Sequence, residues 1–313
     1  VRVSALGLGC AGMSSTPSSR TPAAEAESIA TLEAALEQGI TLLNTGDFYG
    51  MGHNETIIGH ALRNRSDTAF LSVKFGALRA PSGEFLGLDC RPKSVKNFAA
   101  YSLQRLSVEA IDLYQPGRLD PAVPLEETVG AIADLIGEGK VRFLGLSQVT
   151  AEQLLAAHRI HPVTALEIEY SLANRRAEAE IFTTARQLGC GIIAYNVIAQ
   201  GLLTGSIAGE LATNDPRRYL PRFRGANLAT NLRTVASLRE IAAARNATPA
   251  QLAIAWALSR GDDVVPLVGM SQRRYLAENL AAVELNLTDD ERALLEATFA
   301  PGAIVGERTN TPR

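Results

Sequence analysis

The stretch IDLYQPGRLDPAVPLEETVGAIADLIGEGKVRFLGL, residues 111–146, decides the fold. It begins with an apolar run at 111–114, continues through an amphipathic segment at 125–140 and ends in a second apolar run at 141–146. In the middle segment apolar residues recur at three and four positions, which is typical of a helix with one buried face. Two nearly all-apolar strands on either side of such a helix indicate parallel strands covered by helices.

The same alternation continues along almost the whole chain. Further strands are expected at 3–9, 41–44, 70–74, 165–169, 191–195 and 264–269, which brings the number to eight. A doubly wound sheet would also fit the alternation, but no G-x-G-x-x-G phosphate loop follows a strand. The count of eight favours a (β/α)8 TIM barrel, and we expect residues 1–313 to form a single domain of this kind.

Two segments depart from this rhythm. Residues 202–231 follow the seventh strand and contain Gly, Asn, Asp, two prolines and the basic cluster RRYLPRFR. A loop of that length in a compact domain is usually functional. The C-terminal residues 301–313 are expected to form a tail without regular structure.

The composition excludes several classes of protein. The chain has 313 residues, 46% of them hydrophobic, and 30 basic against 33 acidic residues give a net charge of -3. Without a long run of either sign, the charge indicates no nucleic-acid partner. No apolar stretch approaches the roughly 18 residues that span a bilayer, so no membrane partner is expected. The three cysteines are far apart and the four histidines do not cluster, so we expect no metal and reduced thiols in a cytoplasmic protein.

Polar residues are concentrated where the expected strands end. In an α/β barrel the chemistry lies at these carboxyl ends. Lys74 follows the apolar run FLSV directly, and a lysine buried there needs a partner. Tyr49 lies just past the neighbouring strand in NTGDFYG, and a nearby ammonium would lower the pKa of its phenol. The pair therefore predicts a tyrosine that acts as proton donor.

Nearly the whole chain resembles the aldo-keto reductases. The resemblance rests on the motifs NTGDFYG, LSVKFG, IDLYQ, GKVRFLGLS, EIEYSLANR, AYNVIAQGLLTG and VPLVGMS followed by ENL. It implies a (β/α)8 barrel that binds NADPH and passes a hydride to an aldehyde or ketone. It makes Tyr49 the general acid and Lys74 the residue that tunes it. We favour NADPH over NADH as cofactor.

The resemblance also implies a set of cofactor contacts. Ser147, Gln148 and Glu167 would hold the nicotinamide amide, and Glu167 stands where the family usually has a glutamine. Tyr195 would pack beside the ring. The pyrophosphate would lie on the loop that contains Asn196, Gln200, Gly201, Leu203 and Gly205. The 2′-phosphate and adenine would be held by the segment that contains Gly269, Ser271, Gln272, Arg273, Arg274, Tyr275, Glu278 and Asn279. Two arginines at a helix start are also compatible with ordinary surface charge.

Two positions depart from the pattern of the family's catalytic tetrad. The tetrad begins with an aspartate, where this chain has Asn44, and ends with a histidine, where this chain has Gly117. We expect Asn44 to leave the charge of Lys74 unpaired, and Gly117 to leave a hole that water, substrate or Arg118 fills. Arg118 is then either a substrate ligand or a brace of its own loop. This variant branch loosely resembles the pyridoxal reductases.

Several functions stay open on the sequence. The first is reduction of a small-molecule carbonyl substrate. The second is an NADP-binding sensor with weak or no turnover, and the third is alcohol oxidation or lyase-type chemistry on the same fold. His53 is close enough to Tyr49 to be considered as an alternative acid, but we interpret it as loop surface before a helix capped by Asn54. The oligomeric state is unknown.

Overall fold

The computed structural model describes residues 1–63 and 68–309. They group into two compact units. The first comprises Val1–Ile168, Glu178–Tyr195 and Asp263–Ala277, and the second comprises Glu169–Ala177, Asn196–Asp262 and Glu278–Arg313. That residues 1–313 form a single domain stays a prediction.

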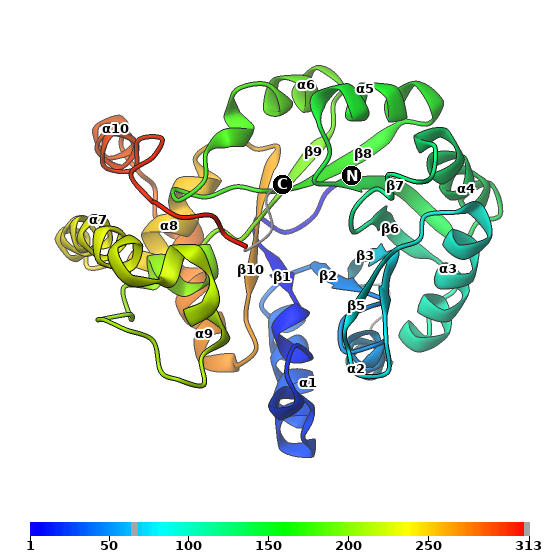
Figure 1. The fold of residues 1–313 in the computed structure, drawn as a ribbon, viewed down its shortest axis with the longest axis horizontal. Helices are drawn as coiled ribbons and strands as arrows, with labels where there is room; N and C mark the ends of the chain where they lie inside the picture. The colour runs from blue at the N-terminus through cyan, green and yellow to red at the C-terminus, as the bar shows by residue number, and fades with distance from the viewer. Residues whose placement is uncertain (64–67, 310–313) are drawn as a thin grey trace. The chain divides into compact units, whose positions relative to one another are not determined.

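A closed barrel of eight parallel strands forms the first unit, and it confirms the predicted fold (Figure 1). Around the ring the order is β1-β10-β9-β8-β7-β6-β3-β2. The strands are β1 (Gly7–Gly9), β2 (Leu42–Gly46), β3 (Phe70–Phe75), β6 (Ile111–Pro116), β7 (Val141–Ser147), β8 (Val163–Glu169), β9 (Gly191–Tyr195) and β10 (Val264–Gly269).

Each expected strand is found, and apart from β1 its ends lie within two residues of the predicted ones. β1 is shorter than the predicted range 3–9, because only Gly7–Gly9 pair with β10 and β2. An unexpected antiparallel hairpin, β4 (Ala77–Arg79) and β5 (Phe85–Leu88), follows β3. Phe85 and Leu86 are exposed, so the hairpin lacks the buried apolar face that makes a strand predictable from its sequence.

Helices of the first unit lie outside the ring of strands (Figure 1). They are α1 (Pro22–Glu37), α2 (His53–Leu62), α3 (Pro92–Leu106), α4 (Leu125–Gly137), α5 (Ala151–Ile160) and α6 (Ile181–Gln187), and α9 (Arg273–Leu280) begins in this unit. Local sequence fixes several starts. Thr150, for example, accepts a hydrogen bond from Gln153 N–H while the Gln153 side chain accepts from Thr150 N–H, which is a capping box.

The barrel interior is filled in layers. One buried apolar layer contains Leu42, Leu113, Ala165, Ile193 and Leu267. Because alternate residues of a strand face the same side, the residues two positions further along these strands also point inward. The apolar layer therefore lies beneath a second layer that belongs to the functional site.

Gly7 shows how closely the apolar layer is packed. A Cβ atom at Gly7 would lie 2.8 Å from Leu42 Cδ2 and 3.0 Å from Leu267 Cδ1. A side chain at position 7 would overlap with the two leucines, which explains the glycine in β1.

The second unit contains η5 (Ala199–Thr204), η6 (Pro216–Tyr219), η7 (Pro221–Phe223), α7 (Gly225–Ala244), α8 (Pro249–Leu258), η8 (Ala281–Glu284) and α10 (Asp289–Thr298). Its fully buried Trp256 packs on Tyr170 with ring centroids 5.1 Å apart. The predicted loop 202–231 holds short 3-10 helices, and its last part is wrong, because α7 already begins at Gly225. The described part of the predicted tail, residues 301–309, contains no helix or strand, as expected.

Within residues 1–63 and 68–309, no helix is both long enough and apolar enough to cross a membrane.

Candidate active site

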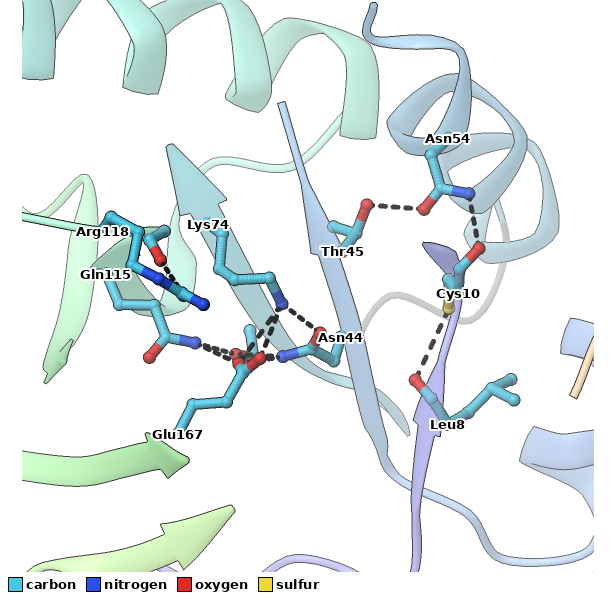
Figure 2. Close-up of polar contacts among 11 residues, drawn as sticks. Leu8, Cys10, Asn44, Thr45, Asn54, Lys74, Gln115, Arg118 and Glu167 are labelled. Carbon is cyan, nitrogen blue, oxygen red and sulfur yellow. Dashed lines mark hydrogen bonds and ion pairs between the residues drawn. The ribbon is translucent and has the colours of Figure 1, made fainter. Parts of the chain in front are cut away.

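A buried polar cluster crosses the upper barrel interior, and Figure 2 shows its side chains converging on Glu167. Lys74 Nζ lies 3.0 Å from Glu167 Oε1 and 3.3 Å from Oε2, and it donates a short hydrogen bond to Asn44 Oδ1. Asn44 Nδ2 donates to Glu167 Oε2 at 2.7 Å, and Gln115 Nε2 donates to the same oxygen at 2.6 Å. Both amides also donate to Ser72 Oγ at 3.1 Å.

Strand parity places these side chains. Asn44, Gln115 and Glu167 come two residues after Leu42, Leu113 and Ala165 of the apolar layer, so they point into the barrel above it. Lys74 comes two residues after Ser72 on β3, so both face the same way. All five are at least 96% buried, and each polar group therefore needs a partner from another wall of the barrel.

The expectation that Lys74 is unpaired is wrong. Its ammonium, on β3, forms an ion pair with Glu167 of β8, three strands further around the ring. Burial is the largest single influence and would lower the pKa of Lys74, but Glu167 and Tyr49 together raise that pKa above its usual value. Lys74 therefore stays charged.

Tyr49 lies beside this pair. The centroid of its ring is 5.4 Å from Lys74 Nζ. The predicted direction of its pKa is wrong, because burial raises the pKa of the phenol, Lys74 lowers it only in part, and Glu167 raises it further. The phenol therefore holds its proton throughout the neutral pH range.

Gly117 leaves no hole. The ring of Phe48, the residue before Tyr49, occupies the space, and a Cβ atom at Gly117 would lie 3.1 Å from Phe48 Cε1. The expectation of a hole filled by water, substrate or Arg118 is therefore wrong. Arg118 is exposed and donates from Nη1 to the carbonyl oxygen of Gly117 at 2.6 Å, a contact that fits the loop-brace alternative.

A second acidic cluster lies behind the loop that carries Tyr49. Asp47 lies two residues before Tyr49, and Glu55, on α2, is fully buried and pairs with Arg105 of α3 at 2.6 Å. Asp47 Oδ1 is buried with no hydrogen-bond partner in the described part of the chain. Burial, with the nearby Glu55 charge, raises the pKa of Asp47 to about 7, and burial also raises the pKa of Glu55.

His53 and Asn54 do not have the places that we expected. α2 begins at His53 and its N-cap is Gly52, which has φ 91°. Asn54 is fully buried, and its side chain bonds Thr45, the Cys10 carbonyl and Ser14. His53 is mostly buried, with its ring nitrogens 2.8 Å from Ser14 Oγ and 2.7 Å from Glu25 Oε1. These contacts give His53 a structural role in joining α1 and α2.

The expected nicotinamide contacts all belong to the first unit: Ser147, Gln148, Glu167 and Tyr195. Ser147 pairs in register with Glu167. Gln148 has left-handed backbone, φ 54°, and its N–H donates to the Glu167 carbonyl at 2.9 Å. Non-glycine residues with positive φ are uncommon and concentrate at functional sites. Both Glu167 carboxylate oxygens, in contrast, are already engaged by protein groups.

The segment from Gly269 to Tyr275 starts α9 in the first unit. Ser271 is half-buried, and Gly269, Gln272, Arg273, Arg274 and Tyr275 are exposed. Arg273 forms an ion pair with Glu27 of α1 at 2.9 Å. Arg274 lies 4.7 Å from the centroid of the Tyr275 ring and donates to its hydroxyl at 2.8 Å. Of the two arginines expected to bind the phosphate, Arg273 is paired with a carboxylate, and Arg274 has no ion pair with a carboxylate in the described residues.

The remaining expected cofactor residues belong to the second unit: Asn196, Gln200, Gly201, Leu203, Gly205, Glu278 and Asn279. Ala199, Gln200 and Gly201 are consecutive left-handed residues. Their N–H groups donate to the Asn196 carbonyl at 2.8 Å, to Asn196 Oδ1 at 2.8 Å and to the Ile198 carbonyl at 3.0 Å, respectively. Arg217 Nη1 donates to the Gln200 carbonyl at 2.7 Å, and a Cβ atom at Gly201 would lie 2.8 Å from that nitrogen. Leu203 and Asn279 are buried, and the Glu278 carbonyl accepts from Gln251.

Sequence reasoning assigned no role in the site to Ser72, Gln115, Phe48 and Asp47. A signal for the first two was available, since a polar residue on the inward parity of an apolar strand needs a polar partner inside the barrel. Phe48 and Asp47 carried no such signal, because their roles depend on which segments pack against them.

Comparison with known proteins gives one consistent family. The model of the Aldo/keto reductase family matches residues 5–299. A protein of Glycine max named probable aldo-keto reductase 1 is 37% identical over 309 residues, which covers 98% of this chain and 88% of that protein.

Solved structures agree. A glycerol dehydrogenase from Gluconobacter oxydans is 27% identical with a TM-score of 0.87, over 100% of this chain and 96% of the other. An aldo/keto reductase from Klebsiella pneumoniae, in complex with NADP and acetate, is 25% identical with a TM-score of 0.76, over 99% and 96%. The holo form of an aldo-keto reductase from Bacillus halodurans is 27% identical with a TM-score of 0.77, over 95% and 93%.

Proposed function

Because the chain belongs to the aldo/keto reductase family of NADP-dependent oxidoreductases, we propose that it reduces an aldehyde or ketone, with Tyr49 as proton donor and Lys74 as the residue that tunes it. The observation that carries the proposal is the phenol of Tyr49 beside a buried, charged ammonium at the carboxyl ends of the barrel strands. This is where α/β barrels carry their chemistry.

The two side chains have complementary tasks. A phenol whose pKa is raised by burial keeps its proton until a stronger base forms next to it, and an alkoxide is such a base. When the proton leaves, the Lys74 ammonium faces the new tyrosinate and stabilises it. Because the ammonium is already in place before the reaction, little reorganisation is needed in the step.

NADPH is the proposed cofactor, and the bound nicotinamide supplies the hydride. In the first unit the donor set suits it: Ser147 and Gln148 offer polar groups for the carboxamide, and Ser271, Gln272 and Arg274 offer donors for a phosphate at the start of α9. Tyr195 is proposed to pack by the ring. In the second unit, the loop at 196–205 is proposed to lie along the pyrophosphate, as the family resemblance implies.

The experiment measures NADPH oxidation with a panel of aldehydes that includes pyridoxal and methylglyoxal. Tyr49→Phe removes the hydroxyl and keeps the ring, so NADPH affinity should hold while turnover falls about 10²–10⁴-fold. Tyr101→Phe, at an exposed tyrosine on α3, is the matched control and should change neither quantity.

Two outcomes would count against the proposal. Full turnover in Tyr49→Phe would assign the acid to another residue. If the unmodified protein binds NADPH and oxidises it with no carbonyl compound of the panel, the alternative of a nucleotide-binding sensor is favoured.

A further inference from the structure

The anion that holds Lys74 comes from β8 and not from β2. We infer that Glu167 is the positioning residue of the Tyr49–Lys74 pair, and that positions 44 and 167 have exchanged an amide and a carboxylate relative to the family pattern. The inference deepens the proposed function and rests on it for its kinetic consequences. Its structural part concerns the protein without cofactor.

The contacts of Asn44 explain why this position carries an amide. Its Oδ1 accepts from the Lys74 ammonium, while its Nδ2 donates to Glu167 Oε2 at 2.7 Å. An aspartate here would keep the first contact and lose the second, since a carboxylate has no N–H to donate. It would also set two carboxylates at hydrogen-bond distance in a buried site, where like charges force one to take a proton.

The amide at 44 and the carboxylate at 167 therefore depend on each other. With glutamine at 167 the Asn44 amide would lose its anionic acceptor, and Lys74 would be buried with no anion among the contacts seen here. Changing both positions together keeps one positive and one negative charge in the cluster. The departures from the family pattern at 44 and 167 thus become one exchange, in which the net charge around Lys74 is unchanged.

The exchange has a consequence for the cofactor. Glu167 Oε1 faces Lys74, and Oε2 accepts from Asn44 and Gln115. A carboxylate so engaged has no hydrogen to donate and few acceptor positions left. We therefore assign Glu167 to Lys74 and leave the carboxamide to Ser147 and Gln148.

Other titratable groups face the same cluster. The Tyr195 phenol on β9 acts on Tyr49, and Lys74 acts on the Cys10 thiol, whose pKa burial raises to about 12. Cys10 is therefore neutral over the working range. Changes of the pH–rate profile in the variants below are accordingly expected from Tyr49, Lys74 and the carboxylate placed at 44 or 167.

The test is a double-mutant cycle with Asn44→Asp, Glu167→Gln and the combination of both. We expect each single substitution to lower kcat roughly tenfold to a hundredfold through misplacement of Lys74, and the combination to recover most of the loss. The basic limb of the pH–rate profile should move in opposite directions in the two single variants. Glu167→Gln removes a charge that raises the pKa of Tyr49 and shifts the limb to lower pH, whereas Asn44→Asp adds such a charge and shifts it to higher pH.

Gln115 provides the matched control. It contacts the same Glu167 oxygen as Asn44, but the ammonium contacts Asn44 and Glu167. Gln115→Glu combined with Glu167→Gln carries the same charges as the exchanged double variant, but it places the carboxylate on β6 and not on β2. It should not restore kcat or the pH–rate profile.

A second readout uses the protein without NADPH. The urea midpoint of unfolding should fall in Glu167→Gln, recover in the exchanged double variant and stay low in the Gln115 control. Equal recovery in both double variants, or additive losses in Asn44→Asp and Glu167→Gln, would overturn the inference. Failure of the unmodified protein to reduce any carbonyl would instead overturn the proposed function, and the unfolding cycle would still decide the role of Glu167.

Discussion

Two sites in the first unit hold buried carboxylates, and they differ in the number of cations available to each carboxylate. In the barrel interior Glu167 has an ammonium of its own and two amide donors. Behind the Tyr49 loop, Asp47 and Glu55 lie near one guanidinium, that of Arg105. In the described residues Arg105 forms an ion pair with Glu55 and none with Asp47. The ratio of cations to carboxylates, rather than burial alone, decides whether an acid inside this protein is charged.

Removing the cation of the interior site should have the largest effect. Lys74→Met leaves Glu167 buried without its cation, and breaking a buried pair in this way costs about 3–5 kcal/mol of the free energy of unfolding. Urea unfolding at neutral pH measures the loss. As the control, Lys74→Met with Glu167→Gln removes both charges and should regain much of it, whereas an unchanged midpoint in Lys74→Met would mean that the ion pair contributes little.

The site behind the loop should respond to pH with the opposite sign to an ordinary salt-bridged acid. The pKa of Asp47 is about 7 in the folded protein, above its ordinary value, so the folded state binds the extra proton. Its stabilising contribution is full below about pH 4 and is lost as pH rises through about 7.

Asp47→Asn removes this dependence and should stabilise the protein above pH 7 by about 2–4 kcal/mol. Urea unfolding of both proteins from pH 5 to pH 8, which is about the window of the titration, measures the difference. Parallel stability curves would show that Asp47 does not titrate there.

The Tyr49 loop also limits what Gly117 can become. Gly117→His needs the space of the Phe48 ring, so alone it should cost about 1–3 kcal/mol of stability and give no gain in turnover. Phe48→Ala with Gly117→His frees that space and adds a donor for the substrate oxygen. Turnover on small aldehydes should then rise roughly tenfold above that of Phe48→Ala. Equal stability of Gly117→His and the unmodified protein would show that the Phe48 ring moves aside at no cost.

The smallest effects are expected where the charges are exposed. Arg274→Ala should weaken NADPH roughly tenfold and leave NADH unchanged, because one charge-assisted contact is lost. Arg273→Ala should do less, because Glu27 already holds Arg273. Fluorescence titration with both cofactors measures this. Equal losses for NADPH and NADH would remove the 2′-phosphate role from α9.

Much of the fold was accessible from the sequence. Apolar runs such as GIIAY and VVPLVG became β9 and β10 with the predicted bounds, because a strand buried on both faces leaves a local signal. The β4–β5 hairpin and the early start of α7 at Gly225 left weaker local patterns. Their exposed or polar residues do not show the periodicity of a buried face.

What the sequence by itself determined is the set of polar residues on the inward parity of the strands, including Asn44, Lys74 and Glu167. What only the tertiary structure decided is that Lys74 pairs with a carboxylate 93 residues away, which itself accepts from an amide 123 residues away. No local pattern records such a partner, because barrel closure alone brings β8 to face the neighbouring strands β2 and β3 across the interior. A buried ammonium needs an anionic partner, and the folded barrel determines which carboxylate lies within reach.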